Sequence, residues 1–355
     1  MNRNKTAEEG RKSEPNAACC INRRQACQWA AAVAAGLFGA GRSGAEGHAL
    51  ATAQAAEPAG EPFRLNYLLA SSLYGTLPLE EVLAEVHRAG ARHIDIWPRV
   101  HADHREQIEA MGHGRFAELL DQHEVELGAV TRFDLGPLRL GEEMDFAARF
   151  GCRLLICGSL PGRVEDGTEL KPAVQRFAEQ LAPHAEAAAE RGITIGIENH
   201  SGMLVRSPDG IRHFLDAAPW PSVGIALAPY HLPQDPELLA GLIDAIGPRL
   251  ALFYAWQHGK GSGELPKEEE LLQLPGRGPL DFGPLLAALK RIDYRGFTEV
   301  FMHPFPRGIP ILPTAAEVTD EINRSRRYLE ECLAEIAPAE PASRQTTADR
   351  AQAPA

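Results

Sequence analysis

The stretch EEVLAEVHRAGARHIDIW, residues 80–97, contains the pattern that decides the fold of this chain. Its first half has apolar residues at helical spacing and ends at Gly90, and residues 93–97 then favour a strand. The same order returns in FAARFGCRLLICGS (146–159), AEAAAERGITIGIEN (185–199) and LLAALKRIDYRGFTEVFM (285–302). A repeated unit of helix, glycine and strand is typical of proteins with a parallel sheet.

The remaining pattern brings the predicted total to eight strands and eight helices. Further strands are predicted at 63–69, 125–131, 222–228 and 249–255. Helices are predicted near 79–89, 104–122, 140–150, 170–191, 208–217, 236–246, 280–291 and 314–335. The strands are short and apolar on both faces, as in a barrel whose sheet is covered by helices. We therefore predict an α/β fold, a single (β/α)8 TIM barrel with a closed parallel sheet, over residues 57–336.

An open, doubly wound sheet is the alternative to the closed barrel. Such a sheet predicts a glycine-rich phosphate-binding turn after its first strand. The chain reads ASSLYGTLP at residues 70–78 instead, which does not have that pattern.

The two ends of the chain differ from this central part. Arg23 and Arg24 precede an uncharged, Ala-rich run at 26–40, which is too short to span a bilayer. With small residues at 51–55 suited to cleavage, residues 1–56 resemble a twin-arginine export signal and linker. This predicts a periplasmic or extracellular protein with no membrane span after cleavage; an uncleaved anchoring helix is the alternative. Residues 337–355 are rich in Pro, Ala and small polar groups and predict a disordered tail.

Composition and charge narrow the class of protein. Hydrophobic residues make up 44% of the 355-residue chain and charged residues 24%, which are globular values. The net charge is −12 overall and −15 without residues 1–56, so we expect no nucleic-acid partner. Only Cys152, Cys157 and Cys332 lie outside the predicted signal, so no disulfide framework is expected.

Glu198 is the most informative of the polar residues that follow the predicted strands. The carboxyl ends of the strands in such a barrel form one face, where the site lies. Glu198 ends the buried run ITIGIEN (193–199), where a carboxylate costs several kcal/mol unless a metal, a cation or a proton neutralises it. It is therefore predicted to be a metal ligand or a general base. A structural ion pair, with Arg132 as the partner, is the alternative.

Two histidines stand at other strand ends. His231 could bind a metal, position a substrate oxygen or cap a loop. The period of a strand puts Glu299, Phe301 and His303 on one face, with Glu299 the deepest if that face points inward. We predict His231 and His303 as catalytic residues together with Glu198, although a core glutamate or a loop histidine would show the same pattern.

Aromatic residues cluster at the same predicted face. Such rings suit the C–H faces of sugars and exclude water, but they could equally be packing residues. Asp95 and His200 also stand at strand ends, without an assigned role. The predicted substrate-binding residues are Trp97, Arg132, Asn199, Tyr230, Tyr254, Trp256 and His258.

Three segments resemble the sugar phosphate isomerase/epimerase group of xylose isomerase-like TIM barrels, a resemblance that extends over about residues 63–335. They are IGIEN (195–199), GIALAPYH (224–231) and GRGPLDFGPLLAALKRIDYRGFTEV (276–300). The resemblance implies a divalent ion held by Glu, Asp, His and Glu on strands five to eight. It also implies carboxylates that move a proton through an enediolate.

The chain departs from the metal-binding pattern of this group. Glu198 matches the first Glu and His231 is retained, but Ala228 replaces the Asp ligand, Tyr254 the His and Phe301 the last Glu. Glu198 and His231 are thus the predicted metal ligands. The site could be rebuilt with His258 and His303 around zinc or manganese, or work without metal through Glu198 and a histidine.

The resemblance predicts an exported sugar isomerase/epimerase-like enzyme acting on a small polyhydroxylated substrate. A free sugar or sugar acid is expected rather than a sugar phosphate, because few basic groups stand at the predicted site. A noncatalytic carbohydrate-binding barrel is the alternative. A DNA-repair endonuclease of the related fold would need three metals and a basic face, which the net charge disfavours.

Overall fold

Eight parallel strands form a closed barrel in a computed structural model that describes residues 62–162, 164, 167–260 and 265–336. Each strand pairs with the next along the chain, and the last pairs with the first. The strands are β1 (Asn66–Ala70), β2 (His93–Ile96), β3 (Glu126–Thr131), β4 (Leu154–Gly158), β5 (Thr194–Glu198), β6 (Val223–Leu227), β7 (Leu250–Ala255) and β8 (Phe297–Val300). The predicted (β/α)8 barrel is confirmed.

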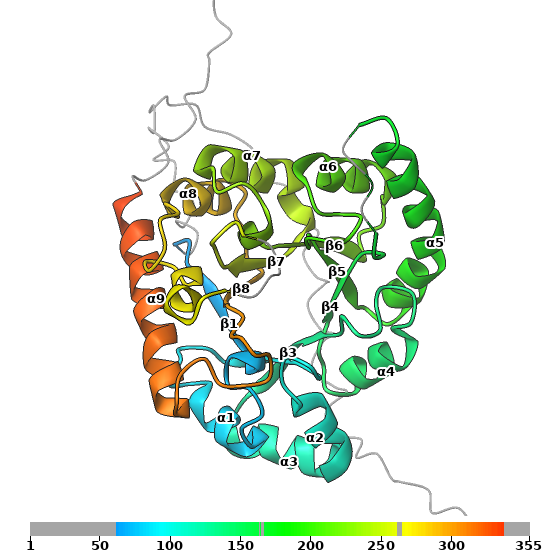
Figure 1. Cartoon of the computed structure of the whole chain (residues 1–355). Coiled ribbons are helices and arrows are strands. Elements are labelled where there is room, and N and C mark those ends of the chain that lie inside the picture. The colour runs from blue at the N-terminus through cyan, green and yellow to red at the C-terminus, as the bar shows by residue number, and fades with distance from the viewer. Residues whose placement is uncertain (1–61, 163, 165–166, 261–264, 337–355) are drawn as a thin grey trace, which may run out of the picture. The chain divides into compact units, whose positions relative to one another are not determined.

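The helices surround this barrel as an outer ring (Figure 1). They are α1 (Leu79–Glu85), α2 (His104–Met111), α3 (His113–His123), α4 (Gly141–Arg149), α5 (Leu170–Glu190), α6 (Pro208–Ala217), α7 (Pro236–Ile246), α8 (Gly283–Arg291) and α9 (Ala315–Glu335). The single helix predicted at 104–122 is wrong, because Gly112 has φ +83° and separates α2 from α3. A helix cannot continue through that backbone conformation, which glycine adopts readily.

The strands are buried on both faces, as their composition predicts. Every residue of β4 and β6 is buried. Between them, β5 is in register so that Glu198 lies beside Gly158 of β4 and Ala226 of β6. The last residue of β5 is therefore surrounded by small neighbours at the carboxyl end of the barrel.

Several predictions concern segments that the structure does not describe. The predicted export signal at 1–56 and the tail at 337–355 lie outside the described residues, and export stays a prediction. Among the helices that are described, none combines the length and apolar character that crossing a bilayer requires. Cys152, Cys157 and Cys332 are free thiols.

Candidate active site

Glu198 lies at the centre of a cluster that also contains His200 and His231. The Glu198 Oε1 atom is 3.5 Å from His231 Nε2, and their side chains are 3% and 0% exposed. One ligand atom from each of the three residues lies within 4.8 Å of the others. The predicted pairing of Glu198 with His231 is thus present, and His200 completes what we call the Glu–His–His cluster.

Asn199 joins the chain just after β5 to the chain just after β6. Its amide nitrogen donates to the Ala228 carbonyl at 2.9 Å, and its amide oxygen accepts from the Ala228 N–H at 2.8 Å. Asn199 is completely buried. The predicted substrate-binding residue therefore has both ends of its amide occupied by backbone, and its role in the structure is to hold His231 next to the end of β5.

Burial sets the charges in the Glu–His–His cluster. It raises the pKa of Glu198 to about 7, and interactions with His200 and Arg307 offset only part of this effect. Burial also lowers the pKa of His200 to about 4 and that of His231 to about 3. At neutral pH both imidazoles are therefore uncharged, and the carboxyl group is balanced between its acid and base forms.

The tautomer of His200 is fixed by its neighbour. Its Nδ1 lies 2.7 Å from the Ser201 carbonyl, which can only accept, so Nδ1 carries the proton. The lone pair of the neutral ring is then on Nε2. A backbone carbonyl holding the other nitrogen is the usual arrangement of a metal-binding histidine.

Aromatic rings form one wall beside this cluster. Tyr230 stacks on Trp256 with ring centroids 4.0 Å apart, and His231 meets the edge of Trp256 at 4.9 Å. Trp97 stacks on Phe301 at 5.1 Å, and Phe301 contacts Trp256 at 4.9 Å. The aromatic residues predicted at the strand ends are thus in contact with one another.

His303 is a second histidine whose ring contacts Trp256. Its centroid is 5.1 Å from that of Trp256 and 4.5 Å from that of His101, on which it stacks. Burial lowers the pKa of His303 well below its usual range, so the ring is neutral. Arg307 Nη1 lies 3.3 Å from His101 Nδ1.

Sequence reasoning missed His101 and Arg307 because both lie in loops, several residues after β2 and β8. One signal was available for Arg307: it is the only Lys or Arg in residues 301–314, which connect β8 to α9.

A layer of buried acids lies deeper in the barrel. Asp95 accepts a hydrogen bond from the Thr131 hydroxyl at 2.7 Å. Within the described part of the chain, Asp95 Oδ1, both oxygens of Glu299 and the Tyr254 hydroxyl have no hydrogen-bond partner within 3.5 Å. Burial raises the pKa of Asp95 to about 7 and that of Glu299 well above its usual range. Glu299 is completely buried and is therefore a deep, inward residue, as predicted, and its burial favours the protonated form.

Arg132 and His258, two of the predicted substrate-binding residues, have partners outside the Glu–His–His cluster. Arg132 pairs with Asp134 at 2.8 Å and with Glu143 at 2.5 Å, so it is not the counterion of Glu198. His258 Nε2 is 3.8 Å from Glu269, and its ring centroid is 6.4 Å from that of Tyr230. The third member of the cluster is therefore His200 rather than His258 or His303.

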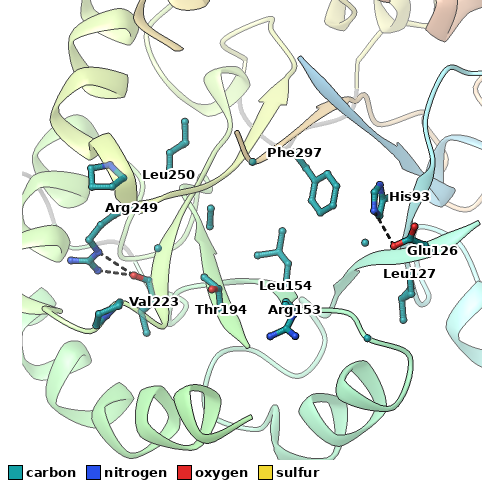
Figure 2. Close-up of a pocket in the computed structure, with 17 residues that line it drawn as sticks. His93, Glu126, Leu127, Arg153, Leu154, Thr194, Val223, Arg249, Leu250 and Phe297 are labelled. Carbon is teal, nitrogen blue, oxygen red and sulfur yellow. Dashed lines mark hydrogen bonds and ion pairs between the residues drawn. The ribbon is translucent and has the colours of Figure 1, made fainter. Parts of the chain in front are cut away.

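A hollow opens at the opposite end of the barrel (Figure 2). It has a volume of about 440 Å³ and is lined by the first residues of several strands, among them His93, Glu126, Thr194, Val223 and Leu250. Arg249 at its edge donates to the Val223 carbonyl at 2.9 and 3.1 Å. In barrels of this class chemistry occurs at the carboxyl end, so this hollow is separate from the candidate site.

The family model for the xylose isomerase-like TIM barrel matches residues 83–332. The chain belongs to this family. A curated relative, the L-ribulose 3-epimerase of Methylomonas sp. (strain DH-1), is 28% identical over 153 residues. The match covers 41% of this chain and 46% of that enzyme, so it spans less than half the length of the relative.

Two solved structures share the barrel fold. D-allulose 3-epimerase from Methylomonas sp. in complex with D-allulose has a TM-score of 0.56 and 18% identity, covering 76% of this chain and 98% of that one. The IolI protein with a bound zinc atom has a TM-score of 0.57 and 16% identity, with the same coverage of 76% and 98%. At these identities the likeness establishes the fold.

Proposed function

We propose that the protein is a sugar isomerase or epimerase that moves a proton on the carbon next to a carbonyl group. The observation that carries this proposal is the buried Glu198 carboxylate, 3.5 Å from His231 and with a pKa raised to about 7. A general base works best when its pKa is close to the working pH. The substrate we propose is a small free sugar or sugar acid.

The Glu–His–His cluster fits a divalent metal. One carboxylate and two neutral imidazoles are a donor set that zinc and manganese accept, and neither ring nitrogen of the fully buried His231 has a hydrogen-bond partner among the described residues. Glu198, His200 and His231 would hold the ion. When bound, such an ion polarises the carbonyl and hydroxyl oxygens of a sugar and makes the neighbouring C–H group more acidic.

The remaining roles follow from the positions of the side chains. Glu198 accepts the proton from the substrate carbon. In an isomerisation it returns the proton to the neighbouring carbon, whereas an epimerisation needs a second acid to deliver a proton to the opposite face. The stacked pair Tyr230 and Trp256 provides an apolar surface for the C–H face of a sugar and keeps water from the exposed carbanion. His303, neutral and in contact with Trp256, is our candidate for the second group that exchanges a proton with a substrate oxygen.

A noncatalytic carbohydrate-binding barrel is the second candidate. It is favoured by the three positions where the family pattern has ligands and this chain has Ala228, Tyr254 and Phe301. All three are buried, and Tyr254 and Phe301 pack against each other at 5.2 Å. None of these side chains is a usual ligand for a divalent ion of this kind.

Metal analysis and solvent exchange distinguish the two functions. The purified protein is loaded with Zn²⁺ or Mn²⁺, its metal content is measured, and a panel of ketoses, aldoses and uronic acids is incubated with it in ²H₂O. Deuterium at the carbon next to the carbonyl, with about one metal ion per chain, supports the enzyme. Sugar binding without deuterium exchange and without bound metal overturns it in favour of the binding protein.

A further inference from the structure

Arg307 is a partly buried cation without an acidic partner. No Asp or Glu oxygen in the described residues lies within 4.0 Å of its guanidinium, which distinguishes it from Arg132 with its two ion pairs. The Arg307 guanidinium donates one hydrogen bond to the described residues, from Nη1 to His101 Nδ1 at 3.3 Å. A guanidinium has five N–H donors, so most of its donors make no hydrogen bond to the described residues and are available to a ligand. Burial lowers the pKa of Arg307, but a guanidinium remains charged at neutral pH.

A chain of ring contacts connects Arg307 to the candidate active site. His101, its hydrogen-bond partner, stacks on His303 at 4.5 Å. His303 meets Trp256 at 5.1 Å, and Trp256 meets His231 of the Glu–His–His cluster at 4.9 Å. The positive charge of Arg307 also lowers the pKa values of His200, His231 and Glu198.

The segment that carries Arg307 is fixed on both sides. Before it, the Phe305 N–H donates to Glu270 Oε1 at 2.8 Å. After it, Pro310 forms an antiparallel bridge with Tyr74, and the Ile311 N–H donates to a backbone carbonyl at 3.0 Å. The backbone on both sides of Arg307 is therefore held in place by contacts with distant parts of the barrel, and the guanidinium itself is held by His101.

We propose that Arg307 binds the carboxylate of the substrate, so that the protein acts on a sugar acid. A charge partly withdrawn from water without a counterion costs free energy that an anionic ligand would recover. A single guanidinium matches a carboxylate, which it binds through two parallel hydrogen bonds. A phosphate ester carries about two charges and usually takes several donors. This inference rests on the proposed function, because it names the substrate class of the same site.

Equilibrium binding of matched sugars tests the proposal independently of turnover. The probes are D-glucuronate, D-galacturonate and D-mannuronate, each compared with its neutral hexose and with glucose 6-phosphate. The variants are Arg307→Gln and Arg307→Lys. Arg153→Gln is the control, because Arg153 is an exposed arginine at the opposite hollow and its removal changes the net charge equally.

We expect at least one uronate to bind wild type and Arg153→Gln at least tenfold more tightly than its neutral hexose. Arg307→Gln should lose this advantage, a 10- to 100-fold weakening that corresponds to one charged hydrogen-bonded pair, while neutral hexose binding stays unchanged. Arg307→Lys should keep part of the preference for the uronate. Circular dichroism shows whether the variants fold. If Arg307→Gln does not fold, the comparison of Arg307→Lys with wild type provides the test.

Three results would overturn the proposal: no preference for any uronate, a tighter Arg307-dependent binding of glucose 6-phosphate, or an equal loss of acid and neutral sugar in Arg307→Gln. Its failure differs from that of the proposed function. Uronate binding that depends on Arg307 without deuterium exchange supports the carboxylate site and removes the isomerase. Exchange into neutral sugars that Arg307→Gln leaves intact keeps the isomerase and removes the carboxylate site.

Discussion

The side-chain amide of Asn199 holds both backbone groups of Ala228, at 2.8 and 2.9 Å. This pair of hydrogen bonds joins the chain just after β5 to the chain just after β6. Glu198 and His200 precede and follow Asn199, and His231 lies in the short 3₁₀ helix Pro229–His231 that begins after Ala228. The Glu–His–His cluster therefore depends on a residue that need not touch a ligand.

Replacement of Asn199 should weaken both the fold and the cluster. Asn199→Ala leaves the buried N–H and C=O of Ala228 without partners, which costs roughly 1–3 kcal/mol in the free energy of unfolding. Asn199→Asp keeps the acceptor but loses the donor. Urea denaturation measures the change, and a value within about 0.5 kcal/mol of wild type for Asn199→Ala would show that the bridge does not support the structure.

Metal binding should depend on the two histidines of the cluster. We expect His200→Ala and His231→Ala each to weaken Zn²⁺ binding at least tenfold, because each removes one of three donors. His258→Ala is the matched control, since its Nε2 lies 3.8 Å from Glu269 rather than in the cluster. Competition with a chromophoric chelator gives the affinities. Equal loss in His258→Ala and His231→Ala would contradict the assignment.

The barrel could be predicted because each of its repeated units is visible in a short stretch of sequence. The units at 80–97 and 185–199 each repeat a helix, a glycine and a strand, and the closed sheet follows from their number. Glu198 could be predicted for a related reason: a carboxylate at the end of an apolar run needs a partner wherever the neighbouring strands lie.

The side chains that surround Glu198 were harder to predict from the sequence. His200 follows β5 but has no distinctive pattern, and its position depends on the Asn199 bridge. The sequence offers Arg132 as a counterion of Glu198, yet Arg132 pairs with the carboxylate of Glu143 on α4. Arg307 is located by a long loop whose path is fixed by contacts with residues distant in sequence.

The buried acids predict how stability depends on pH. Burial raises the pKa of Asp95 from 3.8 to about 7 and raises that of Glu299 as well. The folded protein thus keeps protons that the unfolded chain has released, so this contribution is fully present below about pH 4. It is lost as the pH rises through about 7, and the free energy of unfolding should fall over this range.

Glu299→Gln tests this pH dependence directly. The amide imitates the protonated acid and cannot ionise, so the fall in stability between about pH 4 and pH 8 should become smaller. Urea denaturation at several pH values measures it. A Glu299→Gln variant that is less stable than wild type at pH 8 and keeps the full slope would indicate an ionised, paired Glu299.

The pH dependence of turnover should follow Glu198. A base must be unprotonated to accept a proton, and burial raises the pKa of this carboxyl to about 7. For the metal-free protein we expect kcat/KM for proton exchange to rise with pH and level off above about 7. A rate that is constant from pH 5 to pH 9 would mean that another group accepts the proton.

The most direct test of Glu198 as the base is deuterium exchange from ²H₂O into the carbon next to the carbonyl of a bound sugar, in wild type and Glu198→Gln. Glu269→Gln, a change of the same kind at a partly exposed site, is the control. We predict a 10²- to 10⁴-fold slower exchange in Glu198→Gln, the usual contribution of a positioned base, and an unchanged rate in the control. Exchange at the wild-type rate in a folded Glu198→Gln protein would contradict the central claim.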